Sequence, residues 1–454
     1  MGIGPNGEGP PVGRVLAALA GLAILAYLPV FWQPFVADDF VQIGLAREYG
    51  PASGWAALSQ DPLYRSRATS LVLTWWTERL LGFTPLTFYS TSVLLHILNT
   101  WLVFALGSWP AIGWRAAAVA GAFFAVHEGH QEAVMWYAAL PELLVFFWVL
   151  LSLACWGRWL GRGASAGWYV ASLGCFLLAL FSKESAVVTA PLPLVLGLSE
   201  RAAWRKLAAA APFAAIAVAY MAMIFASQTG HGHFSDGTFS LETPFLTSWA
   251  NSYGRLLWIW GAASLLALAA WRAWRRAKLV WLALVWIAIT LAPYSFLTYM
   301  LRVPSRHTYL ASLGLAWLVA AAALELRERW GAPRRWAVPA VAAVIVAHNV
   351  AYLWIKKRAQ YLERAAPTEK LVELARRVEG PIYVHCFPYG YEIAERAMEM
   401  VVGKPKELLL FGPAADYVNQ PAAIYCGGHR VAEGKSTGRG QAVYFGSGAS
   451  PTHR

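Results

Sequence analysis

Long apolar runs, separated by short polar clusters, make up most of this chain. Two of them, VLAALAGLAILAYLPVFW and LVWLALVWIAITLAPYSFL, are long enough as helices to cross a hydrocarbon core about 30 Å thick. The pattern predicts an all-α polytopic membrane domain with about eleven transmembrane helices. We place these helices near residues 14–36, 86–107, 116–126, 139–157, 167–181, 185–199, 207–226, 247–270, 279–297, 309–325 and 336–355.

The composition agrees with a chain that lies largely in lipid. Of its 454 residues, 58% are hydrophobic and only 14% are charged. Basic cytoplasmic loops account for the net charge of +12, and no basic and aromatic recognition motif is present, so we expect no nucleic-acid partner. The first apolar run, residues 15–36, is longer than a signal-peptide core and lacks a small-residue cleavage pattern before Asp38, so we expect it to be retained.

A different composition begins near residue 356. A charged, helix-like stretch is followed by the β-like runs PIYVHCF, ELLLF and AAIYC. We therefore predict a transmembrane domain, residues 1–355, and a small soluble α/β domain, residues 356–454, with a partly disordered tail. Cys386 and Cys426 lie in this second domain and could pair as a disulfide if it is outside the cytoplasm; no CxxC zinc spacing is present.

Charges of opposite sign gather in alternate loops. Lys and Arg next to membrane spans are retained in the cytoplasm, and with the N-terminus placed there the inner loops are basic and the outer segments acidic. The acidic face and the C-terminal domain are then extracytoplasmic. The cluster Lys356-Lys357-Arg358 does not fit this rule, because it follows the last span on the outer side.

Two acidic motifs are candidates for chemistry on the outer face. Asp38 and Asp39 directly follow the first span, where one carboxylate can accept a proton while the other is held by its neighbours; the alternative is a helix N-cap. His127, His130 and Glu132 interrupt a later apolar run. They could bind a metal, but the spacing is not His-Glu-x-x-His, and solvated loop residues are the simpler interpretation.

Two basic motifs are candidates for phosphate binding. Lys183 stands between two apolar runs in Ser182-Lys183-Glu184, where it either meets a phosphate or is neutralised by Glu184 at a tight bend. Arg302 and Arg306 lie on the next outer segment. An arginine fork matches phosphate oxygens, although an arginine at an interface can also extend toward water without a ligand.

Taken in order, these motifs resemble the multi-pass glycosyltransferases of the C-type fold (GT-C). The similarity is closest to the membrane half of the transmembrane O-mannosyltransferases that carry tetratricopeptide repeats. Asp38-Asp39 matches that family's acidic pair, and His127 through Trp136 matches its His-Pro-Val-His-x-Glu-Ala-Val-x-Trp pattern. Ser182-Lys183-Glu184 matches its Ser-Lys-Glu turn. Its Arg-x-x-Tyr-Leu-x-Ser pattern is matched by Arg306, Tyr309, Leu310 and Ser312.

The chain departs from the family's pattern in three places. Glu128-Gly129 replaces the Pro-Val between the histidines, and Leu140 stands where the family usually has an arginine. No tetratricopeptide repeats follow the last span. The chain therefore looks like a prokaryotic relative in a bacterial inner or plasma membrane, and neither the sugar nor the acceptor can be carried over.

The resemblance implies an inverting transfer of a sugar from a polyprenyl-phosphate carrier to an acceptor at the outer face. Asp38 would be the general base, and Asp39 or Glu132 would orient the acceptor hydroxyl or balance charge. Lys183 and Arg306 would hold the donor phosphate, and the remaining substrate contacts would come from His127, His130, Arg302 and Tyr309. No metal is required by this chemistry, since phosphate leaves as an anion. The alternatives are a membrane transporter and a lipid- or glycan-handling protein without transferase activity.

Overall fold

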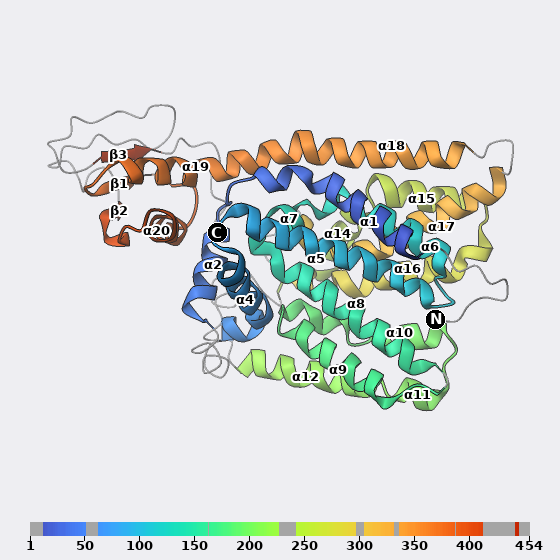
Figure 1. The fold of residues 1–454 in the computed structure, drawn as a ribbon. Helices are drawn as coiled ribbons and strands as arrows, with labels where there is room; N and C mark the ends of the chain where they lie inside the picture. The colour runs from blue at the N-terminus through green and yellow to red at the C-terminus, as the bar shows by residue number, and fades with distance from the viewer. Residues whose placement is uncertain are drawn as a thin grey trace.

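The computed structural model describes residues 12–50, 62–161, 163–226, 242–296, 304–330, 336–385, 387–411 and 441–444. Its long helices run side by side in one bundle, and three short strands lie beyond one end of the bundle (Figure 1). In the labels below, η marks a 3-10 or π turn.

The first part of the bundle begins with α1, whose apolar sequence continues through a short 3-10 turn. Thr84 caps α5, because its side-chain oxygen accepts a hydrogen bond of 3.3 Å from the backbone N–H of Thr87. The elements are α1 (Val12–Tyr27), η1 (Leu28–Trp32), α2 (Asp39–Glu48), α4 (Pro62–Leu81), α5 (Pro85–Ala105), η2 (Leu106–Ser108), α6 (Trp114–Val126), η3 (Glu128–His130), α7 (Gln131–Met135), η4 (Tyr137–Ala139) and α8 (Leu140–Leu160).

The second part packs against the first mainly through α8, which contacts α9, and through α17, which contacts α6 and α16. The elements are α9 (Ala166–Leu180), η5 (Glu184–Thr189), α10 (Leu192–Ser199), α11 (Trp204–Ala208), α12 (Ala211–Ala226), α14 (Phe245–Leu257), α15 (Ile259–Ala270), η7 (Trp274–Arg276), α16 (Ala277–Leu291), η8 (Ala292–Phe296), η9 (Ser305–Thr308), α17 (Ser312–Trp330), α18 (Ala337–Ala351), η11 (Tyr352–Lys357) and α19 (Arg358–Arg377).

Several helices are suited to cross a membrane, so the chain is a multi-pass integral membrane protein. Among the described residues, six segments are long and apolar enough, or seven if one bent pair counts as a span, and three shorter apolar helices accompany them. The predicted number of eleven spans stays a prediction. The six segments are Val12–Trp32, Pro85–Ser108, Tyr137–Leu160, Trp204–Ala226, Trp274–Phe296 and Ala337–Arg377.

The structure corrects one of the predicted spans. The segment 247–270 is not one straight helix, because α14 and α15 meet at Trp258 with a bend of 82°. The polar side chains of Asn251, Ser252 and Arg255 on α14 make a straight course through hydrocarbon unfavourable. Beyond the predicted last span the helix continues, since α18, η11 and α19 form one helical segment that ends at Arg377; the end of the span near residue 355 stays a prediction.

A small parallel sheet follows α19. Its central strand β1 (Ile382–His385) pairs with β2 (Leu409–Phe411) on one side and β3 (Gln441–Tyr444) on the other. Between β1 and β2 lie α20 (Tyr391–Ala397), η12 (Met398–Val402) and η13 (Lys406–Leu408). Arg396 of α20 forms an ion pair of 2.9 Å with Glu48 of α2, so this unit contacts the same end of the bundle as α2 (Figure 1).

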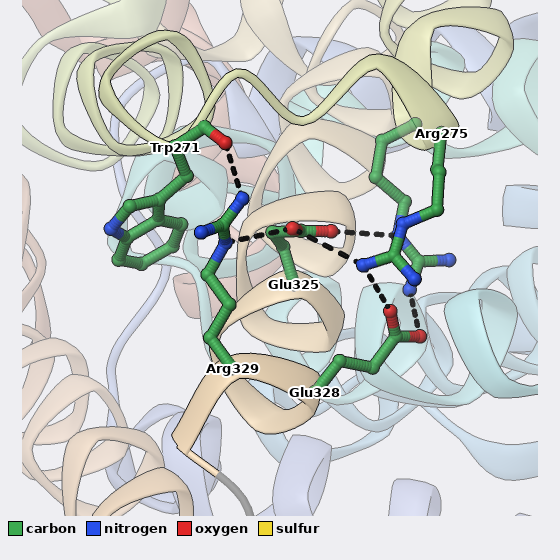
Figure 2. Close-up of polar contacts among 6 residues, drawn as sticks. Trp271, Arg275, Glu325, Glu328 and Arg329 are labelled. Carbon is green, nitrogen blue, oxygen red and sulfur yellow. Dashed lines mark hydrogen bonds and ion pairs between the residues drawn. The ribbon is translucent and has the colours of Figure 1, made fainter.

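An ionic cluster joins elements at the opposite end of the bundle (Figure 2). Glu325 of α17 is 1% exposed and contacts three guanidinium groups, at 3.5 Å from Arg275, 3.7 Å from Arg276 and 2.9 Å from Arg329. Glu328 pairs with the first two of these arginines. A buried carboxylate is tolerated only with such partners, so the cluster fixes the turn between α15 and α16 to the end of α17.

Candidate active site

The two adjacent carboxylates lie in different environments. Asp38 is exposed, and its side chain makes no capping hydrogen bond to α2, so the alternative interpretation as an N-cap is wrong. Asp39 is completely buried. Its Oδ2 accepts hydrogen bonds from the Val36 N–H (2.8 Å) and the Tyr89 hydroxyl (2.7 Å), and its Oδ1 accepts one from the Ala138 N–H (2.9 Å). In this arrangement Asp38, and not Asp39, is accessible to a molecule from outside.

Burial changes the acidity of Asp39, and the backbone beside it is strained. Burial raises the pKa of Asp39 to about 7, although the three donated hydrogen bonds act in the opposite direction. Ala37 has φ +45°, a left-handed conformation that costs a non-glycine residue roughly 1–3 kcal/mol. The hydrogen bonds of Asp39 stabilise the turn in which Ala37 is strained, and this turn determines where Asp38 points.

The segment that carries the carboxylates is bound to the histidine-containing motif about 100 residues later. Gln33 Nε2 donates a hydrogen bond of 2.7 Å to the carbonyl oxygen of Met135, and Trp136 Nε1 donates one of 3.2 Å to the carbonyl oxygen of Val36. Together with the bond from the Ala138 N–H to Asp39, these contacts make the two motifs one structural unit.

Glu132 and Gln131 hold the segment that contains Arg306. Glu132 Oε2 accepts a hydrogen bond of 3.1 Å from the Arg306 N–H and lies 3.7 Å from Nη1 of the same residue. Gln131 donates to the Ser305 hydroxyl (2.6 Å) and accepts from the Tyr361 hydroxyl of α19 (2.6 Å). The helix α19, beyond the predicted last span, therefore takes part in the same polar network.

Two arginines stack on Trp136. The guanidinium carbon of Arg306 lies 4.9 Å from the centre of the indole ring, and that of Arg364 lies 4.8 Å from it. Such cation–π contacts do not use up the N–H donors of a guanidinium group. The Tyr389 hydroxyl donates a hydrogen bond of 2.6 Å to the backbone carbonyl oxygen of Arg364, and Tyr389 interacts electrostatically with Asp38. These contacts connect the carboxylates and the arginines in one region.

Lys183 is paired with a different carboxylate from the one that the sequence suggests. Its ammonium group donates to Oε1 of Glu142 at the start of α8, whereas Glu184 lies 3.6 Å from Arg67 of α4. Glu142 also accepts a hydrogen bond of 3.0 Å from the Tyr294 hydroxyl. Burial lowers the pKa of Lys183, and Glu142 opposes that effect. The predicted phosphate ligand is thus part of a buried ion pair in this structure.

His307 lies between these two groups of charges. Its ring stacks on Tyr294 with the ring centres 4.3 Å apart, and its Nε2 is 4.0 Å from Glu142. Burial, followed by Arg306, Lys183, Arg67 and Arg255, lowers the pKa of His307 well below its usual value. The imidazole is therefore neutral at pH 7, and its approach to Glu142 is not an ion pair.

The remaining aromatic candidates from the sequence lie in the interior. His130 is fully buried and bonds to the Ser312 hydroxyl at 2.6 Å, while Tyr309 bonds to His96 (2.8 Å) and Asn99 (3.2 Å). His127 is 6% exposed and contacts Glu128 at 3.1 Å. All three contact other protein groups in this structure, and their expected contact with substrate stays a prediction.

Some predicted residues fall outside the part that the structure describes. These are Arg302, Cys386 and Cys426. Within the described ranges, His, Cys, Asp and Glu side chains do not come together in any group of three that could hold a metal ion. His127, His130 and Glu132 therefore do not form a ligand set here, since their side chains contact Glu128, Ser312 and Arg306.

Comparison with known proteins gives one match in sequence. No protein-family model matches the chain. A segment of 106 residues, 23% of the chain, is 32% identical to Protein O-mannosyl-transferase Tmtc1 of Drosophila melanogaster, and it covers only 12% of that protein. The resemblance to this group of membrane glycosyltransferases is confirmed.

Solved structures give weaker likenesses. ArnT from Cupriavidus metallidurans, bound to undecaprenyl phosphate, is 17% identical with a TM-score of 0.46, over 88% of this chain and 77% of ArnT. The archaeal oligosaccharyltransferase AglB from Archaeoglobus fulgidus, in complex with an inhibitory peptide and a dolichol-phosphate, is 13% identical with a TM-score of 0.49, over 87% of this chain and 64% of AglB.

Sequence reasoning missed several residues of this network. Glu142 stands inside a predicted span, and an ionisable residue in such a place is a recognisable signal. Tyr361 and Arg364 gave no signal, because they belong to a stretch in which charged residues are frequent. Only the fold shows that α19 contacts Gln131 and Trp136.

Proposed function

We propose that this protein is an inverting glycosyltransferase that moves a sugar from a polyprenyl-phosphate carrier to an acceptor hydroxyl on a protein, glycan or lipid. The observation that carries the proposal is the exposed Asp38, positioned by the buried Asp39 beside arginines that stack on Trp136. A base and a cationic group on one surface are what such a transfer needs. The sequence match to a protein O-mannosyl-transferase supports the same reaction class.

Asp38 acts as the general base in this proposal. It takes the proton of the acceptor hydroxyl while the acceptor oxygen attacks the anomeric carbon. The bond between that carbon and the phosphate oxygen breaks, and its electron pair leaves with the polyprenyl phosphate. A single displacement inverts the configuration at the anomeric carbon. Asp39 does not touch substrate; it is a positioning residue that fixes the turn carrying Asp38.

Arg306 and Lys183 stabilise the leaving phosphate. The developing negative charge is favoured by preorganised cations in a site of low dielectric constant. Glu132 orients Arg306 through its contacts with the Arg306 N–H and guanidinium. Lys183 is already paired with Glu142. To stabilise the phosphate as well, its ammonium group must share its hydrogen-bond donors between Glu142 and the phosphate. His127, His130, Tyr309 and Arg302 are further proposed substrate contacts.

We place this site on the extracytoplasmic face of a bacterial inner or plasma membrane. The basic loops at the opposite end of the bundle, which include Arg275 and Arg276, support that orientation by the positive-inside rule. Residues 1–355 would be the transmembrane catalytic domain and residues 356–454 a small extracytoplasmic domain, although the helix that joins them is continuous.

The test is sugar transfer in proteoliposomes with labelled polyprenyl-phosphate sugars. We expect Asp38→Asn to lower the rate about 10²- to 10⁴-fold, the usual contribution of a general base. The matched control is Glu373→Gln, which removes an exposed carboxylate on α19 that pairs only with Arg377 among the described residues. Full activity of Asp38→Asn would remove the assigned base. A product with retained anomeric configuration would exclude the single displacement.

A further inference from the structure

Arg364 differs from Arg306, Lys183 and Arg67 in its partners. Arg306 pairs with Glu132, Lys183 with Glu142, and Arg67 with Glu184. Within the described part of the chain, Arg364 pairs with no carboxylate; its guanidinium lies over Trp136 and Tyr361, and its backbone carbonyl accepts a hydrogen bond from the Tyr389 hydroxyl. A half-buried guanidinium without an anionic partner is a natural ligand for an anion.

The position of Arg364 suits a ligand that Arg306 also contacts. Both guanidinium carbons lie within 5 Å of the same indole centre, so they are at most about 10 Å from each other. A phosphate group accepts hydrogen bonds of roughly 2.8 Å from each guanidinium and can bridge two of them. The cation–π contacts with Trp136 do not use up the N–H donors of either guanidinium group, so these donors are available for such a bridge.

The surrounding charge is also positive. Lys357 interacts electrostatically with Glu132, which also pairs with Arg306, and with the cations Lys356, Arg255 and Arg364. Lys357 belongs to the basic cluster on the outer side that the positive-inside rule does not explain. A phosphate-binding role gives this cluster a reason to be at the end of the bundle that carries Asp38.

We propose that Arg364 is a phosphate-binding residue of the donor site, so that the helix beyond the last span completes the site. This inference rests on the proposed function for the identity of the ligand, a polyprenyl phosphate. Arg364 and Arg306 bridge the phosphate oxygens, and the bridge strengthens as the phosphate gains charge on leaving. Tyr361 and Gln131 are positioning residues, because their hydrogen bond holds α19 against α7.

Binding is measured on the full chain in nanodiscs, with undecaprenyl phosphate as the probe and undecaprenol, which lacks the phosphate, as the reference lipid. We expect Arg364→Gln to weaken binding of undecaprenyl phosphate at least about tenfold, as loss of a charge-assisted bond implies, and to leave undecaprenol unchanged. Arg364→Lys should recover part of the loss. The control Arg376→Gln, an exposed arginine roughly 18 Å further along α19, should bind like the unaltered protein.

Two results would overturn the inference. One is undecaprenyl phosphate binding by Arg364→Gln that equals that of the unaltered protein. The other is an equal loss for undecaprenol, which shows that Arg364 only supports the fold. In a transfer assay the same variant should lower kcat more than it raises KM for the donor. If the unaltered protein binds undecaprenyl phosphate but transfers no sugar, the proposed function fails, while the binding comparison still decides the role of Arg364.

Discussion

Replacing Asp39 with asparagine tests how a buried carboxylate can position the catalytic one. Two donors, the Val36 N–H and the Tyr89 hydroxyl, converge on Oδ2, and the Ala138 N–H meets Oδ1. An asparagine amide has one oxygen, so in its best orientation it accepts the first two bonds and turns its NH₂ toward Ala138. One buried donor is then unsatisfied, which costs about 1–3 kcal/mol.

The pH dependence of stability should change as well. The pKa of Asp39 is raised from 3.8 to about 7 in the folded protein, so the native state retains a proton that the unfolded chain loses. The stabilising contribution is full below pH 3.8 and is lost as pH rises toward 7. Between pH 5 and pH 8 the unaltered protein should therefore lose about 3 kcal/mol of unfolding free energy relative to Asp39→Asn.

The measurement is equilibrium unfolding in mixed micelles at several pH values, followed by tryptophan fluorescence. The two stability curves should converge as pH rises, because only the unaltered protein has the Asp39 carboxyl group, whose deprotonation destabilises the folded state. Glu399→Gln, which removes an exposed carboxylate, should give a curve parallel to that of the unaltered protein. Parallel curves for Asp39→Asn would refute the argument that burial controls the acidity of Asp39.

Two further predictions concern paired charges. Glu325→Gln should lower the unfolding free energy by about 1–3 kcal/mol, because the buried carboxylate makes charge-assisted contacts with three partly exposed arginines (Figure 2). Glu328 is 44% exposed, so Glu328→Gln should cost at most about 1 kcal/mol. Equal losses in denaturant unfolding would contradict this. Lys183→Met should lower the unfolding free energy by about 3 kcal/mol, because it leaves the buried Glu142 without its partner. Adding Glu142→Gln should restore stability but not sugar transfer. Restored transfer in the double variant would exclude Lys183 as a phosphate ligand.

The apolar pattern predicted the helices well because lipid imposes a length and a hydrophobicity on each span. Every predicted segment contains a helix. The pattern could not predict the change of helix direction at Trp258, because α14 packs there against α16 and η8, which come later in the sequence. Nor did the change to charged residues after 355 reveal that the helix continues without a break to Arg377.

The candidate site was only partly predictable, because charge identifies a residue but not its partner. The pair Asp38 and Asp39 stood out in the sequence, yet their opposite exposure depends on Tyr89 and Ala138, which come from α5 and the turn before α8. Likewise, one of the two alternatives for Lys183 paired it with Glu184, its neighbour in the chain, but it pairs with Glu142, 41 residues away. Such choices follow from packing between helices and leave no local pattern.

The pairing of the cations distinguishes two halves of the site, one around Lys183 and one around Trp136. Lys183 and Arg67 each face a carboxylate, so that half of the site is close to neutral and can be buried without a ligand at moderate cost. Around Trp136 the cations outnumber the carboxylates, and that half gains most when an anion arrives. A lipid phosphate should therefore bind first beside Arg306 and Arg364. Lys183 contributes only later, when the phosphate carries the additional negative charge of a leaving group. The phosphate then competes with Glu142 for the hydrogen-bond donors of Lys183.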